Sequence, residues 1–387
     1  MLKRIVMILG AGASQPIVPV ASDLLKVITS RSYGLSGDPS HELYWHPQCG
    51  GYIFRWLWEQ AGKPNNFERL LDLALEKAHQ SSAWPWESAA WLNAAHDATH
   101  AIALQIAKNV AESDNEAPII AWLNSLNAFT GSITIGSLNW DDLVLKSSCP
   151  WYDGYEHKEN GMFENDYFHH VGDHTRKLLW LHGSIHLNRV VDHSNGSLRQ
   201  SEFQWNCNPI EELHKWLIGS NSDNRPVFDL PIVTGGDKSL QIFRRPFLEY
   251  WSVLYQDILQ ADTIAILGYS GHDSHLNSLL TEGIRGNSHL RKIVWVGKSA
   301  SNKSEVLTTL ARVLGLPQYR LEHECVGRHA FRCLRPISAQ MENALPPRIE
   351  TWVCLKGIET ISSERTKQQW IRLMEIRDSF HEKVKKH

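Results

Sequence analysis

The sequence predicts an α/β protein organised around an open, doubly wound and mostly parallel sheet. Five short apolar runs recur along the chain, and none of them alternates polar with apolar residues, as expected for strands covered on both faces. Each run ends at a glycine or a polar turn, and helical patterns separate the runs, which is the order of elements in such a sheet. The runs cover residues 5–9, 133–137, 177–181, 263–267 and 292–296.

The first run continues straight into a glycine turn, which reads Gly10-Ala11-Gly12-Ala13-Ser14. Glycines leave room for a phosphate to approach the backbone, and the free N–H groups of a following helix favour an anion, so the turn predicts a nucleotide cradle. It is not the dehydrogenase fingerprint, because the third glycine would fall at Gln15 and no acidic residue ends a clear second strand about 20 residues on. A turn that merely joins a strand to a helix is the alternative.

A helical insertion separates the first two strands. A short amphipathic helix is expected after Ser22, and residues 31–52 read as a loop rich in Gly, Pro, Ser and His. From 52 to 129 the pattern is helical, with apolar residues recurring at three- and four-residue steps from Phe67 to Leu75. We therefore expect residues 1–300 to form one nucleotide-binding domain, interrupted by a helical insertion over 52–129.

Polar residues follow the second and third strands directly. The run 133–137 leads to Asn139-Trp140-Asp141-Asp142, and the run 177–181 leads to His182-Gly183-Ser184. A polar segment with scattered aromatic residues occupies 150–175. The polar, glycine- and proline-rich segment 187–240 is expected to be either a lid over a ligand or a long surface excursion.

Regular structure resumes with a helix over 246–260. The run 263–267 then enters Gly268-Tyr269-Ser270-Gly271-His272-Asp273, followed by a helix around 274–284. Residues 301–387 are expected to form a C-terminal α/β extension. It would hold a helix near 303–314, strands at 319–325 and 351–355, and a charged terminal helix over 363–385.

Composition narrows the class of protein. The net charge of −3, from 39 basic and 42 acidic residues, lacks the strongly basic footprint of nucleic-acid binding. The six cysteines form no C-x-x-C pair, so neither a zinc ribbon nor a disulfide framework is indicated. No signal sequence and no membrane-spanning stretch is evident, and with scattered free thiols this favours the cytoplasm. The 16 tryptophans are expected in the core or, alternatively, at a subunit interface.

The polar groups at four strand ends are expected to form one site, because ligands of such sheets bind beyond the carboxyl ends of the strands. Each group also has a structural explanation taken alone. Asn139 or Asp142 could cap the helix that follows. His182 could be a core histidine with its hydrogen bonds satisfied, and Gly268-Tyr269-Ser270 could form an ordinary turn. The joint occurrence at successive strand ends favours a functional site.

At these residues the chain resembles the sirtuin family. Gly10-Ala11-Gly12-Ala13-Ser14 is similar to the sirtuin phosphate loop, and Asn139-Trp140-Asp141 looks like its N-x-D motif. His182-Gly183 is similar to the catalytic His-Gly, and Gly268-Tyr269-Ser270 to the later glycine–serine loop that holds the nucleotide. The motifs occur in family order and cover roughly residues 1–30 and 130–300. The resemblance implies a Rossmann-like, sirtuin-like sheet with NAD as substrate.

Sirtuin deacylases carry a four-cysteine zinc ribbon, which this chain lacks. The closer resemblance is therefore to the SIR2-like NAD hydrolases of bacterial antiphage defence, some of which work with a HerA-like ATPase. That resemblance implies cleavage of NAD⁺ to nicotinamide and ADP-ribose, with no metal. We also expect a homo-oligomer whose helical insertion or terminal helix supplies the contacts.

Roles follow from the chemistry of cleaving a bond to a cationic leaving group, which passes through an oxocarbenium-like transition state. Asn139 is expected to orient a water or a ribose hydroxyl, and His182 to accept a proton. Asp141 would contact the nicotinamide or stabilise the sugar cation. The cradle at 10–14 would hold the pyrophosphate, with Gly268, Ser270 and Asp273 near the ribose or adenosine.

Three other functions stay open. His96 and His100 have the i, i+4 spacing of a zinc hydrolase motif, with Asp97 in place of its glutamate. A nucleotide-binding scaffold subunit without catalysis is the second. Transfer of ADP-ribose to a macromolecule instead of to water is the third.

Overall fold

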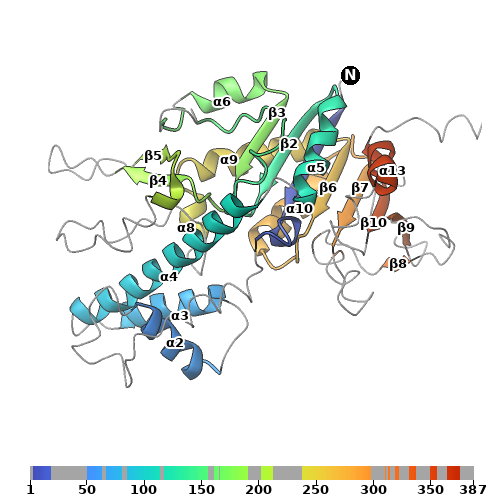
Figure 1. Cartoon of the computed structure of the whole chain (residues 1–387). Coiled ribbons are helices and arrows are strands. Elements are labelled where there is room, and N and C mark those ends of the chain that lie inside the picture. The colour runs from blue at the N-terminus through green and yellow to red at the C-terminus, as the bar shows by residue number, and fades with distance from the viewer. Residues whose placement is uncertain are drawn as a thin grey trace, which may run out of the picture.

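The protein is described from a computed structural model. It covers residues 3–18, 50–62, 67–80, 85–113, 117–155, 161–164, 166–190, 202–211, 238–297, 310, 313, 319–321, 331–336, 349–354 and 364–374. An eight-stranded sheet runs through the molecule in the order β3-β2-β1-β6-β7-β10-β9-β8 (Figure 1). Its strands are β1 (Arg4–Leu9), β2 (Ser132–Ser137), β3 (Arg176–Trp180), β6 (Thr263–Leu267), β7 (Lys292–Val296), β8 (Tyr319–Leu321), β9 (Phe331–Pro336) and β10 (Glu350–Cys354).

The first six strands of this order are all parallel, and β9 and β8 add an antiparallel edge. Numbered along the chain, the parallel strands follow the 3-2-1-4-5-6 order of dinucleotide-binding sheets. The predicted α/β class and the mostly parallel Rossmann-like sheet are therefore confirmed. The strand order changes direction between β1 and β6, which is the position at which ligands bind in sheets of this kind.

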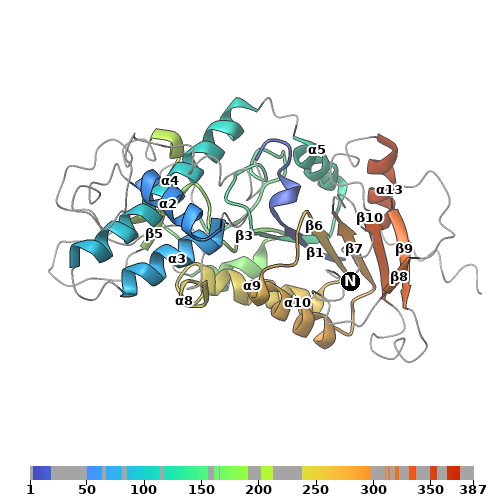
Figure 2. The same cartoon turned by 90° about the horizontal axis from the view of Figure 1, so that it is seen from below.

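Helices cover both faces of the sheet. In Figure 2, α9 (Phe247–Gln260) and α10 (Ser274–Gly286) lie on one face, and α5 (Pro118–Ser125) lies on the other. As a result every residue of β6 and β7 is buried, although Lys292 is charged. This double cover explains why the strands read as unbroken apolar runs rather than as alternating ones.

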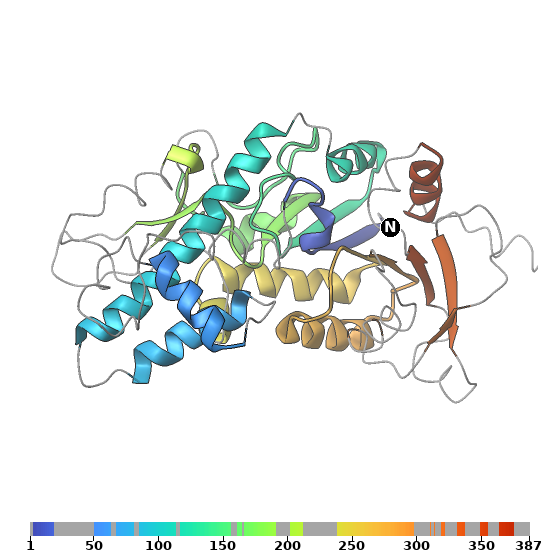
Figure 3. The ribbon, with the colours of Figure 1, turned by 60° about the horizontal axis from the view of Figure 1, so that its bottom comes forward.

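The predicted helical insertion contains α2 (Gly50–Gln60), α3 (Phe67–Gln80) and α4 (Pro85–Glu112), which pack against one another. Figure 3 shows these helices projecting from one end of the sheet. Trp56 and Trp91 meet there with ring centroids 6.0 Å apart, so at least this tryptophan pair serves packing within the chain. Among the described helices, none is long and apolar enough to cross a membrane.

The C-terminal extension continues the main sheet, because β10 pairs in parallel with β7. Helix α13 (Glu364–Met374) packs against α5 through Trp370 and Trp122, whose ring centroids lie 4.8 Å apart. The buried Lys292 ammonium donates a hydrogen bond of 2.6 Å to the Leu373 carbonyl in the last turn of α13. Trp370 is thus a core residue of this chain, whereas residues 375–385 of the expected terminal helix lie outside the described residues.

Some elements differ from the sequence-based expectations. The segment 187–240 contains a small antiparallel sheet of β4 (Leu187–Val190) and β5 (Glu202–Trp205), and ends in α8 (Lys238–Ile242). Strand β9 and the short helix α6 (Tyr167–His170) were not expected either. The helix expected after Ser22 and most of the helix expected over 303–314 lie outside the described residues.

A close backbone contact joins the loops that follow β1 and β6. The Gly12 N–H donates to the Gly268 carbonyl at 3.0 Å, and the Gly10 N–H donates to the Leu267 carbonyl at 2.9 Å. Gly268 has a φ of +63°, and a Cβ atom built on it would lie 2.1 Å from the Ala13 nitrogen. These two loops therefore require glycine for their own packing.

We expect Gly268→Ala to lower the free energy of unfolding by about 3 kcal/mol or more, since backbone strain and a clash with backbone atoms add together. Gly62→Ala is the matched control, because Gly62 has a φ of +74° but open space around its Cβ position. The strain alone should cost that control about 1–2 kcal/mol. Urea unfolding of both variants measures the difference, and equal losses would contradict the packing role of Gly268.

Candidate functional site

The loops after β1, β2, β3 and β6 meet at the carboxyl edge of the sheet, as predicted. Backbone hydrogen bonds extend the strand pairing into these loops, from Leu138 N–H to the Leu9 carbonyl at 2.9 Å and from Leu181 N–H to the Ser137 carbonyl at 2.9 Å. The register places Asn139 and His182 each two residues beyond the end of a strand, and both side chains are buried. The structure therefore positions the two expected catalytic residues on neighbouring loops.

Three of the predicted site residues form one buried hydrogen-bond relay. The Ser14 hydroxyl donates to Oδ2 of Asp141 at 2.6 Å, and the Asn139 amide donates through Nδ2 to Ser14 Oγ at 2.7 Å. Both oxygens of Asp141 are used, because Oδ1 accepts the Leu143 N–H at 3.2 Å. The relay joins the loop after β1 to the loop after β2 and determines which way the Asn139 amide faces.

The relay leaves one polar atom unsatisfied, because Oδ1 of Asn139 is buried and has no hydrogen-bond partner within the described part of the chain. A buried carbonyl oxygen without a partner is costly, typically by about 1–3 kcal/mol. Such an atom in a ligand-binding edge indicates an acceptor that is kept for a donor from outside the protein, such as water or a hydroxyl.

Burial raises the pKa of Asp141 to about 6, although the hydrogen bonds from Ser14 and Leu143 oppose the shift. The adjacent Asp142 carboxylate raises it slightly further. Asp141 thus titrates close to neutral pH, and it is enclosed by groups of the protein itself. This arrangement makes Asp141 an anchor of the Ser14–Asn139 relay.

His182 forms a second contact across the site. Its Nε2 lies 2.9 Å from Oδ2 of Asp273, an ion-pair distance without the alignment of a good hydrogen bond. Burial alone would raise the pKa of Asp273, but His182 and the ammonium of Lys238 lower it. The ionised Asp273 favours the proton on Nε2 of the imidazole, so Nδ1 carries the lone pair that is able to accept a proton.

Asp273 is therefore bound to His182 and not simply exposed to a ligand. Its other oxygen, Oδ1, caps α10 by accepting the Leu276 N–H at 2.9 Å. The Tyr269 hydroxyl accepts the Asp273 N–H at 3.1 Å and bonds to Asn277 at 2.7 Å, which holds the loop after β6 rigid. Ser270, expected beside the nucleotide, is exposed on this loop.

The glycine turn differs from the predicted cradle in how its backbone is used. The helix expected to follow it at once is a 3-10 turn over Ala11–Ala13, and residues 19–49 lie outside the described residues. The N–H groups of 10, 12, 13 and 14 already donate to carbonyls of the protein. Within the described part of the chain, the N–H of the exposed Ala11 is the one backbone donor of residues 10–14 without a carbonyl partner. The turn therefore offers a phosphate fewer backbone N–H groups than the motif suggested.

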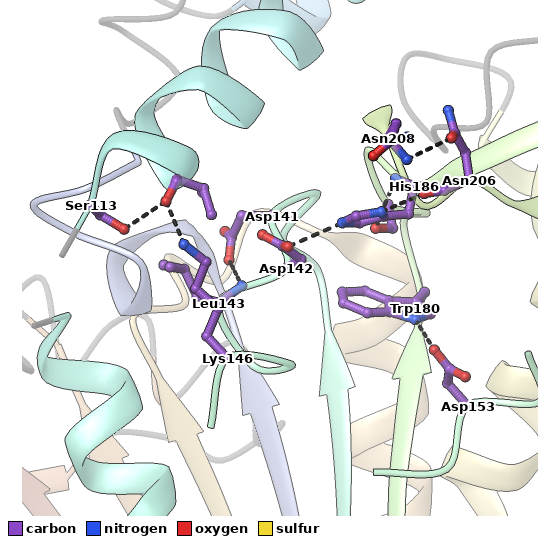
Figure 4. Close-up of polar contacts among 12 residues, drawn as sticks. Ser113, Asp141, Asp142, Leu143, Lys146, Asp153, Trp180, His186, Asn206 and Asn208 are labelled. Carbon is purple, nitrogen blue, oxygen red and sulfur yellow. Dashed lines mark hydrogen bonds and ion pairs between the residues drawn. The ribbon is translucent and has the colours of Figure 1, made fainter. Parts of the chain in front are cut away.

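A third polar group lies beside the site and was missed as a functional element. His186 contacts Asp142 through Nε2 at 3.0 Å and the Asn206 carbonyl through Nδ1 at 2.7 Å (Figure 4). Its ring stacks on Trp205 at a centroid distance of 4.5 Å and an angle of 4°. The spacing of His182 and His186 was visible in the sequence, but their carboxylate partners come from distant segments.

Comparisons with known proteins leave the family open: no family model and no curated protein matches this chain. For the zinc alternative, the described residues contain no group of three or more His, Cys, Asp or Glu arranged to hold a metal ion. His100 is buried within α4, and the side chain of His96 lies outside what the structure describes.

The buried Asp141 predicts a pH-dependent gain in stability for Asp141→Asn. The native pKa of about 6 lies above the ordinary aspartate value of 3.8, so the native state holds the proton more tightly and wild-type stability falls as pH rises between these values. Asparagine does not titrate and still accepts from Ser14. Between pH 4 and pH 7, the free energy of unfolding of the variant should therefore rise by on the order of 3 kcal/mol relative to that of the wild type. Urea unfolding across this range measures the gain, and a pH-independent difference would contradict the raised pKa.

Proposed function

We propose that this site cleaves NAD⁺ at the bond between nicotinamide and ribose, giving nicotinamide and ADP-ribose. The observation that carries the proposal is the unpaired Oδ1 of Asn139, buried at the carboxyl edge with its amide orientation fixed by Ser14. Beside it, on the next loop, stands His182 with a carboxylate partner. An oriented acceptor and a base are what attack by water on a sugar carbon requires.

The bond between nicotinamide and ribose determines which catalytic groups the protein needs. The nicotinamide of NAD⁺ leaves as a neutral ring, so its departure needs no general acid. The transition state has positive charge on the ribose, as in glycoside hydrolysis. The site residues supply an acceptor for a water or a ribose hydroxyl at Asn139, a proton acceptor at His182, and negative charge from the aspartates nearby.

The structure supports different roles for Ser14, Asp141 and Asp273 from those that the motifs suggested. Ser14 and Asp141 use their polar atoms on Asn139 and on each other, so we infer that they position the amide. Asp273 lies against His182, so we infer that it orients the imidazole. In this proposal Asn139 and His182 are the residues that meet the reacting atoms.

The biological setting proposed here comes from the resemblance to the SIR2-like enzymes of antiphage defence. Uncontrolled loss of NAD⁺ would kill the producing cell, so we propose that activity depends on assembly into a homo-oligomer, with or without a HerA-like ATPase. Separation of the products from NAD⁺ tests the reaction itself. Free ADP-ribose supports hydrolysis, a labelled macromolecule supports ADP-ribosyl transfer, and unchanged NAD⁺ with bound nucleotide supports a binding subunit.

Asn139→Ala and His182→Ala should each slow nicotinamide release by roughly 10²- to 10⁴-fold, the usual range for a lost acid–base group. Affinity for NAD⁺ should change much less, because both groups act mainly on the transition state. The losses should not multiply in the double variant, since both serve one step.

Asn127→Ala is the matched control for the asparagine. Asn127 makes the same kind of bond, from Nδ2 to the Ser148 hydroxyl at 2.6 Å, but on the exposed surface. Its replacement should leave turnover unchanged. Near-normal turnover in a folded, correctly assembled Asn139→Ala protein would falsify the mechanism.

Asp273→Asn should slow turnover by roughly 10-fold or more, because the amide no longer favours the proton on Nε2 of His182. Asp257→Asn is the control, since Asp257 forms an ion pair of 2.9 Å with Lys177 at the start of β3, away from the site. The pH profile of kcat should move in the Asp273 variant alone. An unchanged pH profile of kcat in Asp273→Asn would contradict the role of Asp273 in orienting His182.

A further inference from the structure

We propose that Asp142, His186 and Asn206 form a clamp that sets the position of Asn139 relative to His182. The inference rests on the proposed function and adds positioning residues to it. Asp142 follows Asn139 by three residues, and His186 follows His182 by four, so the clamp joins the far ends of the two loops that carry the reacting groups.

The contacts across the two loops form a ladder. At its base, the Leu181 N–H donates to the Ser137 carbonyl at 2.9 Å, and further out the Ile185 N–H donates to the Trp140 carbonyl at 2.8 Å. At its end, Asp142 Oδ2 lies 3.0 Å from His186 Nε2. The side-chain pair therefore closes the loops beyond Asn139 and His182, where backbone pairing has ended.

The third member ties the clamp to the small sheet of β4 and β5. The Asn206 carbonyl accepts from Nδ1 of His186 at 2.7 Å, and in return the Asn206 N–H donates to the His186 carbonyl at 2.7 Å. Trp205 stacks on the imidazole. The small sheet of β4 and β5 thus braces the site from the side through His186.

The hydrogen bonds also define the charge of the clamp. Burial alone would raise the pKa of Asp142, but the His186 hydrogen bond, its charge and the charge of Lys146 lower it. Asp142 is thus a carboxylate, and the Asn206 carbonyl is an acceptor only. Nδ1 of His186 therefore donates to that carbonyl, while Nε2 faces the ionised carboxylate. A charge-assisted pair of this kind fixes geometry more strongly than a neutral one.

The clamp predicts a loss of turnover rather than of binding. In His186→Ala, kcat for nicotinamide release should fall by roughly 10- to 100-fold through misplacement of the loops, with KM within about threefold of wild type. Asp142→Asn should cost less, because its amide oxygen still accepts from Nε2. A double-mutant cycle tests whether the two residues act together. The kcat of the Asp142→Ala, His186→Ala double variant should lie within about threefold of the kcat of the more severe single variant.

The control is His170→Ala, which breaks a carboxylate–imidazole pair with Glu164 on the exposed surface. It should leave kcat unchanged. Turnover of His186→Ala within twofold of wild type, or a loss confined to KM, would overturn the clamp, as would fully multiplicative losses in the cycle.

A second readout does not need NAD⁺. Hydrogen exchange of peptides covering 139–143 and 202–208 should speed up by roughly 10-fold in His186→Ala and stay unchanged in His170→Ala. If wild-type protein shows no NAD⁺ cleavage, the proposed function fails while faster exchange still supports the clamp. Unchanged exchange in His186→Ala overturns the clamp in either case, and Asp142→Ala provides the same test if His186→Ala does not fold.

Discussion

The close approach of two glycine loops is the constraint on which the site depends. Gly268 reaches the backbone of Gly12 at hydrogen-bond distance, at the place where the strand order changes direction between β1 and β6. Any side chain at Gly268 would strike the loop after β1. Because this contact fixes both loops, Ser14 and Asp273 arrive at set positions, and each then meets a partner on the loops after β2 and β3.

The polar residues of the site largely satisfy one another before any ligand binds. Asp141 and Ser14 hold the Asn139 amide, and Asp273 holds His182. Preorganised groups of this kind need no rearrangement when charge develops in a reaction, which is where electrostatic catalysis gains most. The unpaired Oδ1 of Asn139 stands out within the relay, because the side-chain oxygens of Ser14 and Asp141 are all hydrogen-bonded.

Much of the fold was predictable, since continuous apolar runs such as Ile264–Leu267 indicate strands buried on both faces, and their polar ends indicated where the site lies. The pairings were not predictable. Asp273 and His182 come from distant loops, and motif order alone placed Asp273 near a nucleotide. The β4–β5 sheet was missed because its strands are only four residues long, too short for the alternation of polar and apolar residues in Glu202–Trp205 to stand out.

The adjacent aspartates Asp141 and Asp142 show why residue type alone did not define their roles. Asp141 is enclosed with a neutral hydroxyl, so burial dominates and its pKa rises to about 6. Burial would raise the pKa of Asp142, but the hydrogen bond from His186 and the charges of His186 and Lys146 outweigh burial, so this pKa falls. One carboxyl is thereby able to lose or keep its proton near neutrality, while its neighbour stays ionised. The charge of Asp142 faces His186 at 3.0 Å, so it acts first on the contact between the two loops.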